Sequence, residues 1–243
     1  MDKLKELQDV IDRSQNIVFF GGAGVSTESN IPDFRSSDGV YSVTLGRHFT
    51  AEQLVSHTMF ERYPEDFFDF YKKYLLYPDA KPNVAHRYLA WLEQTGKLKA
   101  VVTQNIDSLH EMAGSKKVLK LHGSADRNYC TGCQRFYDLE AFLALAGTIP
   151  HCLDCGKVVK PDVTLYEEPL DMDVFSQAAR AIQEADLLII GGTSLVVYPA
   201  ASLIQYFQGK NLVVINKTSI QQDKQADLVI EGKIGQVFSK LRQ

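Results

Sequence analysis

We predict an α/β fold built on a parallel, doubly wound sheet, because short apolar runs of strand type alternate with helical patterns along the 243 residues. The first run, at 17–20, has no polar break and leads directly into a glycine turn, as a strand buried on both faces does. Two long intervals, 37–80 and 124–156, interrupt the alternation. Because unstructured loops of that length are uncommon in compact domains, we expect both to be folded insertions packed against the sheet.

The remaining elements follow from the same patterns in chain order. Leu4, Leu7 and Ile11 recur at helical spacing among charged residues, which predicts an opening amphipathic helix. Further strands are expected at 100–103, 118–121, 187–190, 212–215 and 227–230, and helices at 83–93, 174–184 and 199–208. The first insertion is rich in aromatic residues at mostly helical spacing, and the second holds all four cysteines.

The charge balance and the lack of long apolar runs exclude several classes of protein. With 26 basic and 30 acidic residues the formal net charge is -4, so the chain has no net electrostatic footprint for nucleic acid. The N-terminal segment is charged throughout, and no apolar run approaches the ~18 residues that a membrane-spanning helix needs. We therefore expect a cytoplasmic protein that does not bind membranes, and nonspecific binding to nucleic acid is disfavoured. In that reducing compartment cysteines serve more often as metal ligands or catalytic thiols than as disulfides.

The cysteines form the most specific spacing pattern in the sequence. Cys130-x-x-Cys133 and Cys152-x-x-Cys155 are separated by 18 residues, which lies within the spacing window of zinc sites. Two such knuckles close a tetrahedral shell of four thiolates and leave no position for water, so we predict one structural Zn²⁺. A redox-active dithiol pair is the alternative. His151 adjoins the second pair, but with four thiolates available it is predicted to be a surface histidine.

The turn after the first predicted strand contains Gly21, Gly22 and Gly24. Glycine lets backbone N–H groups approach a phosphate, and a following helix would add its positive N-terminal end. The usual dinucleotide fingerprint is incomplete, because Thr27 stands at the third glycine position and Pro32 interrupts any long helix. Alone, the turn is weak evidence for a dinucleotide site.

Polar clusters follow other predicted strands at their carboxyl ends, where open α/β sheets bind ligands. Gln104, Asn105 and Asp107 could hydrogen-bond an amide or a ribose, but Asp107 or Ser108 could equally cap the next helix. His122 suits a general base, although a lone histidine is more often structural. The other clusters of this kind comprise Gly191, Gly192, Thr193, Ser194, Asn216 and Lys217.

Taken together and in this order, the motifs resemble those of the sirtuin family, the NAD-dependent protein lysine deacylases. The resemblance covers nearly the whole chain, and several independent motifs in fixed order are far more specific than any one of them. They are Gly22-Ala23-Gly24-Val25-Ser26, Ile31-Pro32-Asp33-Phe34-Arg35-Ser36, Thr103-Gln104-Asn105-Ile106-Asp107 with Leu109-His110, Leu121-His122-Gly123, the two cysteine pairs, Gly192-Thr193-Ser194-Leu195 and Ile215-Asn216.

The resemblance implies a Rossmann-type large domain and a smaller domain made of a zinc ribbon and a helical module. NAD and an acyl-lysine peptide would enter the cleft between the two domains from opposite sides. The implied division assigns 1–36, 81–123 and 157–243 to the Rossmann-type domain, 37–80 to the cofactor loop and helical module, and 124–156 to the zinc ribbon.

The resemblance also implies a reaction and the residues that carry it. The acyl oxygen attacks the anomeric carbon of NAD, nicotinamide leaves, and His122 removes a proton from the ribose so that its oxygen can attack in turn. Water then releases lysine and O-acyl-ADP-ribose. Asn105 and Asp107 complete the implied catalytic set. The implied NAD contacts are Gly22, Ala23, Gly24, Ser26, Thr27, Phe34, Arg35, Gln104, Asn105, Ile106, Asp107, His122, Gly192, Thr193, Ser194, Asn216, Lys217 and Ile234, and the implied substrate contacts are Val163, Thr164, Leu165, Tyr166 and Glu167.

Two places depart from the usual family pattern, and a third bears on acyl preference. Asn30 stands where glycine is usual, and asparagine tolerates the positive φ that such a turn needs. In the substrate segment Tyr166-Glu167-Glu168 replaces the commoner Phe-Gly-Glu. The stretch 70–74 lacks the Tyr-x-x-Arg of sirtuins that remove succinyl or malonyl groups. Without an arginine fork for a carboxylate, a short neutral acyl group such as acetyl is favoured.

Two other functions stay open beside lysine deacetylation. Mono-ADP-ribosyl transfer would use the same activation of NAD, but it needs no base on the ribose, so His122 counts against it. An NAD-sensing regulator could bind nucleic acid through the zinc ribbon, whose basic residues are offset by acidic neighbours. We therefore predict an NAD-dependent deacetylase of acetylated-lysine proteins or peptides. The sequence leaves its oligomeric state open, with a monomer favoured.

Overall fold

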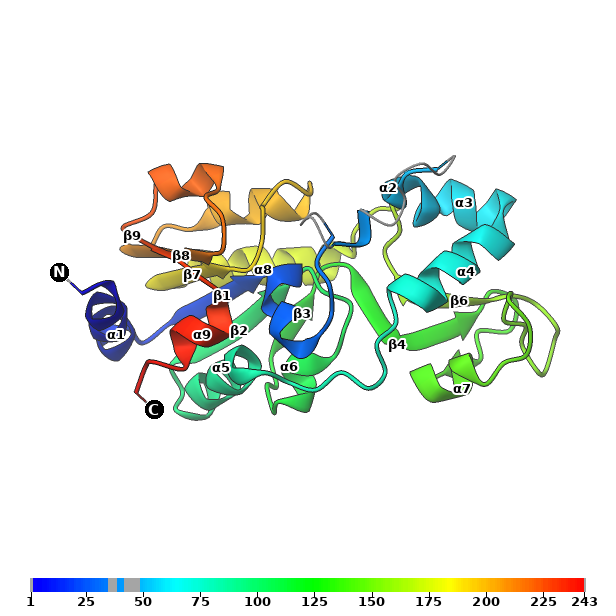
Figure 1. Cartoon of the computed structure of the whole chain (residues 1–243), viewed down its shortest axis with the longest axis horizontal. Helices are drawn as coiled ribbons and strands as arrows, with labels where there is room; N and C mark the ends of the chain where they lie inside the picture. Colours follow the sequence, from blue (N-terminus) through cyan, green and yellow to red (C-terminus); the bar gives the residue numbers. More distant parts are fainter. Residues whose placement is uncertain (1, 35–38, 42–48, 243) are drawn as a thin grey trace.

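The computed structural model describes residues 2–34, 39–41 and 49–242 and shows two lobes (Figure 1). The larger lobe contains a six-stranded sheet in the order β3-β2-β1-β7-β8-β9, in which every strand pair is parallel. The strand order runs outward from β1 and β7 in opposite directions, so the crevice in which such sheets bind ligands lies at their carboxyl ends. The strands are β1 (Ile17–Gly21), β2 (Leu98–Thr103), β3 (Val118–Lys120), β7 (Leu187–Gly191), β8 (Asn211–Asn216) and β9 (Leu228–Glu231).

Helices cover both faces of this sheet, because its central strands direct alternate apolar residues into two cores. Phe19 and Ile189 belong to the core beneath one set of helices, whereas Phe20 and Ile190 belong to the core on the other face. Every residue of β1 is buried, as predicted for a strand covered on both faces. The helices are α1 (Lys3–Arg13), α5 (Val84–Gln94) and α9 (Ile234–Phe238) on the first face, and α8 (Met172–Gln183) and the 3-10 helix η4 (Ala200–Tyr206) on the second.

The strands and helices predicted for the larger lobe are present, with small shifts at their ends. The helix expected at 199–208 forms as the 3-10 helix η4. A 3-10 helix has three residues per turn, so residues three apart lie on the same side. Ala200 and Leu203 have this spacing, and both are fully buried.

The smaller lobe combines the two insertions. The first contributes α2 (Ala51–Leu54), α3 (His57–Arg62) and α4 (Pro64–Tyr74). The second contributes α7 (Leu139–Leu143) and most of an antiparallel sheet in the order β5-β4-β6. The strands of this sheet are β4 (Gly123–Cys130), β5 (Phe136–Tyr137) and β6 (Val159–Val163).

The expectation that the insertions pack against the large sheet is wrong. They pack against each other around a core of their own, in which Phe68 and Tyr71 of α4 contact Phe142 of α7. Helices of the larger lobe already cover both faces of the six-stranded sheet. The aromatic face of α4 is therefore buried against the other insertion, and the two lobes remain distinct (Figure 1).

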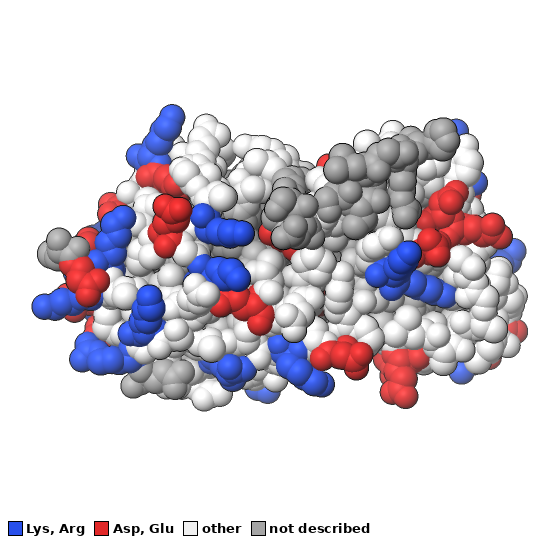
Figure 2. Space-filling model, viewed as in Figure 1, with Lys and Arg blue, Asp and Glu red and all other residues white. Residues whose placement is uncertain are grey.

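The distribution of charged side chains and the helix lengths are two further features of the described residues. Figure 2 shows acidic and basic side chains interspersed over one face of both lobes, without a field of one sign. Within the described ranges, no helix is both long enough and apolar enough to cross a membrane.

Candidate active site

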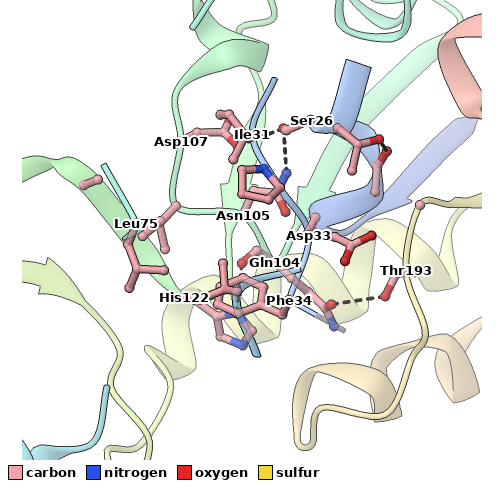
Figure 3. Close-up of a pocket in the computed structure, with 18 of the residues that line it drawn as sticks. Ser26, Ile31, Asp33, Phe34, Leu75, Gln104, Asn105, Asp107, His122 and Thr193 are labelled. Atoms are coloured by element: carbon pink, nitrogen blue, oxygen red, sulfur yellow. Dashed lines mark hydrogen bonds between the residues drawn. The ribbon is translucent and has the colours of Figure 1, made fainter. Parts of the chain in front are cut away.

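A cavity of about 1050 Å³ lies between the lobes, at the carboxyl ends of the central strands. It gathers the predicted contacts from several strand ends (Figure 3), and residues of the substrate segment also line it. Gly22 does not line it but lies against Thr193, and Arg35 and Ser36 lie outside the described residues. The predicted residues that line it are Ala23, Gly24, Ser26, Thr27, Phe34, Gln104, Asn105, Ile106, Asp107, His122, Val163, Thr164, Leu165, Tyr166, Glu167, Gly192, Thr193, Ser194, Asn216, Lys217 and Ile234.

The glycine turn after β1 packs backbone against backbone on the turn after β7. Gly24 N donates to Gly192 O at 2.8 Å, and a Cβ at Gly24 would lie 2.8 Å from Gly192 Cα. Glycine is therefore needed for the contact between the two turns. The chain continues into the short 3-10 helices η1 (Ala23–Val25) and η2 (Thr27–Ser29), so no long helix follows the turn. Asn30 ends η2 with φ 63°, the positive value expected for it.

One hydrogen-bonded group links the turn after β1 to the loop after β2. Ser26 Oγ donates to Asp107 Oδ2 at 2.8 Å, and Asn105 Nδ2 donates to Ser26 Oγ at 3.0 Å (Figure 3). Asp107 Oδ1 also accepts the backbone N–H of Leu109, which begins α6 (Leu109–Met112), at 3.1 Å. Burial raises the pKa of Asp107, and the hydrogen bonds from Leu109 and Ser26 oppose that shift. Asp107 therefore bonds to the start of a helix and also faces the cavity. Helix capping and ligand binding, the two roles predicted for it, are compatible.

A second group joins the ends of β2, β7 and β8. Thr193 N donates to Asn216 Oδ1 at 3.0 Å, and Asn216 Nδ2 donates back to Thr193 O at 2.9 Å. Thr193 Oγ1 donates to Gln104 Oε1 at 3.2 Å (Figure 3). These bonds fix the orientation of both amides. The Nε2 of Gln104 is buried and has no partner among the described residues, so it is a donor available to a ligand.

His122 lies where the two sheets meet, between β3 and β4. Its Nδ1 is 2.9 Å from Gln104 O, and because a carbonyl oxygen can only accept, Nδ1 carries the proton and Nε2 keeps its lone pair. Burial lowers the pKa of His122, although the bond to Gln104 opposes the shift, so the ring is neutral at pH 7. Gly123 has φ 76°, and a Cβ there would overlap Asp162 O, so this turn requires glycine. Among the described residues, the site thus presents a neutral imidazole whose Nε2 is available as an acceptor.

The predicted substrate segment runs from the end of β6 along the cavity. Thr164 N donates to the backbone O of His122 at 3.0 Å, which holds the segment beside the imidazole. Tyr166 forms a parallel bridge with the residue that caps α3. Glu167 has φ 75°, and its carboxylate accepts Thr58 N at 2.9 Å and Thr58 Oγ1 at 2.7 Å. The segment is therefore attached to both lobes.

The cysteines form a candidate metal centre in the smaller lobe. Their four Sγ atoms lie within 4.8 Å of one another, which suits one Zn²⁺ with Zn–S distances of about 2.3 Å. The hydroxyl of Tyr137 donates to Cys152 Sγ at 3.3 Å, as expected for a sulfur that carries negative charge. His151 is exposed and bonds to Gly156 O at 3.0 Å, so it is a surface residue as predicted. The residues that could hold the ion are Cys130, Cys133, Cys152 and Cys155.

Several residues that line the cavity escaped the sequence analysis. Tyr71, Tyr74 and Leu75 reach it from the end of α4. The aromatic spacing at 70–74 indicated a packed helix face, but nothing in it indicated that the face borders a cavity. Tyr198 also lines the cavity, with 69% of its surface exposed. No sequence pattern distinguishes such an exposed tyrosine from a buried one.

The fold and the site define a class of protein: a two-lobed α/β protein with a ligand cleft at the switch point of its sheet, a neutral histidine in the cleft and a four-cysteine centre in the smaller lobe. The model of the Sir2 family matches residues 22–199. The chain belongs to the Sir2 family. The family predicted from the motifs is therefore confirmed.

Relatives match the chain over nearly its whole length. A Clostridium perfringens (strain 13 / Type A) protein named NAD-dependent protein deacetylase is 63% identical over 241 residues, 99% of this chain and 98% of that protein. A Cutibacterium acnes protein of the same name is 47% identical and spans 98% of this chain and 97% of its own. A solved structure of Sir2 with a p53 peptide and NAD+ is 37% identical, with a TM-score of 0.86 over 98% of this chain and 96% of that one. Another, Sir2 with a deacetylated p53 peptide and 3'-O-acetyl ADP ribose, is 36% identical, with a TM-score of 0.89 over 97% and 96%.

Proposed function

We propose that this chain is an NAD-dependent protein lysine deacetylase, which transfers the acetyl group of acetylated lysine to ADP-ribose and releases nicotinamide. The observation that carries the proposal is the neutral His122, whose free Nε2 belongs to the same cavity as Asn105, Asp107 and the substrate segment. The activity for which the relatives are named supports it.

NAD supplies the anomeric carbon whose bond to nicotinamide breaks. Asn105, Ile106 and Asp107 hold the carboxamide and the adjacent ribose, and Phe34 excludes water from the reacting carbon. The Nε2 of Gln104, which has no partner among the described residues, supports a ligand in this part of the cavity. A buried donor without an acceptor lowers the stability of the fold unless a bound ligand supplies the acceptor. In the same proposal the glycine turn and Arg35 bind the pyrophosphate of NAD, and residues at the ends of β7 and β8 contact the adenosine.

His122 acts as the general base of the proposed reaction. Its Nε2 accepts the proton of a ribose hydroxyl, which allows that oxygen to attack the acetyl carbon. The Nδ1–H bond to Gln104 O remains in the protonated ring, because a carbonyl oxygen accepts from either form, and it stabilises the resulting positive charge. A zinc ion held by four cysteines would have a closed shell, so it would stabilise the smaller lobe and leave the chemistry to His122.

We infer that the substrate is an acetylated lysine in a protein or peptide that lies along 163–167. Solved Sir2 structures that contain p53 peptides support this inference. Ile106, Leu75 and Val163 give the cavity apolar walls between the lobes. Tyr71 and Tyr74 border it, and no arginine stands in 70–74, which favours a short neutral acyl group over a carboxylate.

We propose that the predicted domains have separate functions. The ranges 1–36, 81–123 and 157–243 form the NAD-binding domain, and 37–80 and 124–156 form the smaller domain, with β6 closing its sheet from the last range. Zinc in the smaller domain, a cytoplasmic location, a monomeric state and the lack of nucleic-acid partners belong to the same proposal. Mono-ADP-ribosyl transfer is the second candidate, because it would use the same cleavage of NAD.

One assay separates these functions. The protein is incubated with NAD and either an acetyl-lysine or a succinyl-lysine peptide, and nicotinamide, O-acetyl-ADP-ribose and protein-bound ADP-ribose are measured. We expect nicotinamide and O-acetyl-ADP-ribose in equal amounts, with the acetyl peptide strongly preferred. His122→Ala should keep the melting temperature and lower turnover by at least about 100-fold, the usual contribution of a general base.

Three outcomes would contradict parts of the proposal. Full turnover by His122→Ala would exclude His122 as the base. Label on protein without O-acetyl-ADP-ribose would indicate ADP-ribosyl transfer. Equal rates on the acetyl and succinyl peptides would exclude the preference inferred from 70–74.

A further inference from the structure

Lys120 is a buried cation that the proposed reaction does not use. It is the last residue of β3, and only 7% of its side chain is exposed. Its Nζ lies 2.8 Å from Ser108 Oγ, 3.1 Å from Ser124 Oγ and 3.0 Å from Glu111 Oε1. An ammonium group has three N–H donors, so each of them has an acceptor.

The three acceptors belong to two segments that border the cavity, namely α6 with its N-cap residue and the start of β4. Ser108 directly follows Asp107, Glu111 lies in α6, and Ser124 lies in β4 just after His122. Lys120 itself precedes His122 by two positions. One ammonium group therefore connects the loop that carries Asn105 and Asp107 to the junction that carries His122.

We propose that Lys120 is a positioning residue, which fixes the Asp107 loop against the His122 strand end and so preforms the site for the ribose next to nicotinamide. The inference rests on the role proposed above for Asp107 in binding NAD. It adds a residue that no motif indicated, since the side chain does not line the cavity and its hydrogen bonds run to Ser108 and Glu111 and not to Asp107.

The electrostatics of Asp107 point in the same direction. Burial raises the pKa of Asp107, the charge of Lys120 opposes that shift, and the carboxylate of Glu111 adds to it. His110, which also lies on α6, is buried and neutral, because burial holds its pKa well below the usual value. Loss of Lys120 would therefore leave Glu111 as the charged neighbour and favour protonation of Asp107.

The competing interpretation is that Lys120 only stabilises the fold of the larger lobe and does not position the NAD site. If Lys120 only stabilised the larger lobe, its loss would affect NAD, peptide and turnover together. A positioning role predicts a selective effect on NAD and on the pH dependence, because Asp107 is the proposed ribose contact, whereas the substrate segment bonds to the backbone of His122 and not to the Asp107 loop. The two interpretations therefore differ in measurable quantities.

The test compares Lys120→Met with Lys117→Met, an exposed lysine near the start of the same strand. For Lys120→Met we expect a KM for NAD about tenfold higher, the order expected for one hydrogen bond to a charged group. The KM for the acetyl peptide should stay unchanged. The acid limb of the equilibrium affinity for NAD, which does not require His122 to act as a base, should move to higher pH. Lys117→Met should behave like the wild type in all three measurements. Equal effects of Lys120→Met on both KM values, or no shift of the acid limb, would overturn the proposal.

Two further variants keep the outcome interpretable. Glu111→Gln, at a side chain that is 40% exposed, should move the acid limb to lower pH, because it removes the charge that raises the pKa of Asp107. If Lys120→Met does not fold, an unshifted acid limb in Glu111→Gln overturns the proposal. Asp107→Asn tests the underlying role: a wild-type KM for NAD in this variant would refute the NAD contact itself. If Asp107→Asn raises the KM for NAD but Lys120→Met leaves it at the wild-type value, only the role of Lys120 is refuted.

Discussion

Three histidines, of which two are buried and one is partly buried, have different surroundings, and these surroundings set what each can do. His122 donates from Nδ1 to Gln104 O and keeps an acceptor beside the cavity. The rings of His86 and His110 pack edge to face with centroids 4.7 Å apart, and both are almost completely buried. His86 Nε2 and both ring nitrogens of His110 lack a partner among the described residues. This pair therefore suits a structural role in which both rings stay neutral.

The histidine pair should make the fold sensitive to acid. Burial lowers the pKa of His86 to about 4 and holds that of His110 well below its usual value. The unfolded chain binds these protons near pH 6.5, so stability is full above about 6.5 and falls as the pH drops towards about 4. For His86 the loss amounts to about 3 kcal/mol at the end of that range.

Urea unfolding at pH 7 and pH 5 measures this effect. His110→Leu removes one titrating ring and no hydrogen bond, so it should keep or raise the stability at pH 7. The variant should lose less stability than the wild type between the two pH values. Because all other titrating groups are common to both proteins, an equal loss would show that His110 does not contribute.

At the scale of elements, the loop after β6 is the feature that departs most from the family pattern. Glu168 of this loop bonds to His57 of α3 at 3.0 Å and to Lys160 of β6 at 3.2 Å. Glu167 occupies a left-handed position that favours glycine, and its carboxylate is held by Thr58. Bonds to α3 thus replace the conformational freedom of glycine as the means of shaping the substrate segment.

Substitutions at Glu167 separate the two contributions. Glu167→Gly loses the bonds to Thr58 but relaxes the backbone, whereas Glu167→Ala loses the bonds and keeps the unfavourable φ. We expect the KM for the acetyl peptide to rise in the order wild type, Glu167→Gly, Glu167→Ala, with the KM for NAD unchanged. Glu61→Ala, at an exposed position of α3, is the matched control. A lower KM in Glu167→Ala than in Glu167→Gly would contradict this account.

At the scale of the whole molecule, the site exists only because two lobes with separate cores meet at the strand ends. The larger lobe supplies Asn105, Asp107 and the glycine turn, and the smaller lobe supplies α4 and the strand that leads to the substrate segment. His122 lies at the junction of the two sheets. Stability of the smaller lobe is therefore a condition for the proposed activity.

Removal of zinc should unfold the smaller lobe selectively. Cys130 and Cys152 are buried in its core. Without the ion, neither Cys-x-x-Cys turn would be held by metal–sulfur bonds, and the core around these turns would lose stability. On chelation we expect deacetylation to stop and amide protection to be lost in β4, β5 and β6, while the six-stranded sheet keeps its protection. Hydrogen exchange with and without chelator measures this, and added Zn²⁺ should restore both properties. A metal-free protein with full activity and intact protection would rule out the zinc assignment.

Much of the fold and part of the site follow from local sequence. Unbroken apolar runs such as 17–20 predict buried parallel strands because covering both faces leaves no polar position. The cysteine spacing predicts the cluster that the structure contains, since each knuckle is a local feature. The strand-end positions of Asn105 and His122 predict their meeting, because the carboxyl ends of parallel strands share one edge.

The rest depended on the tertiary structure. Local patterns could not show that α4 packs on α7 and not on the large sheet, because that choice depends on which faces are already covered. They gave no sign that Lys120 is buried among Ser108, Glu111 and Ser124, since a lysine ending a strand is usually solvated. The sequence by itself therefore determined the strands, the four-cysteine cluster and the family. The tertiary structure alone decided how the lobes pack and which charges surround Asp107, because both depend on contacts between residues that are distant in the chain.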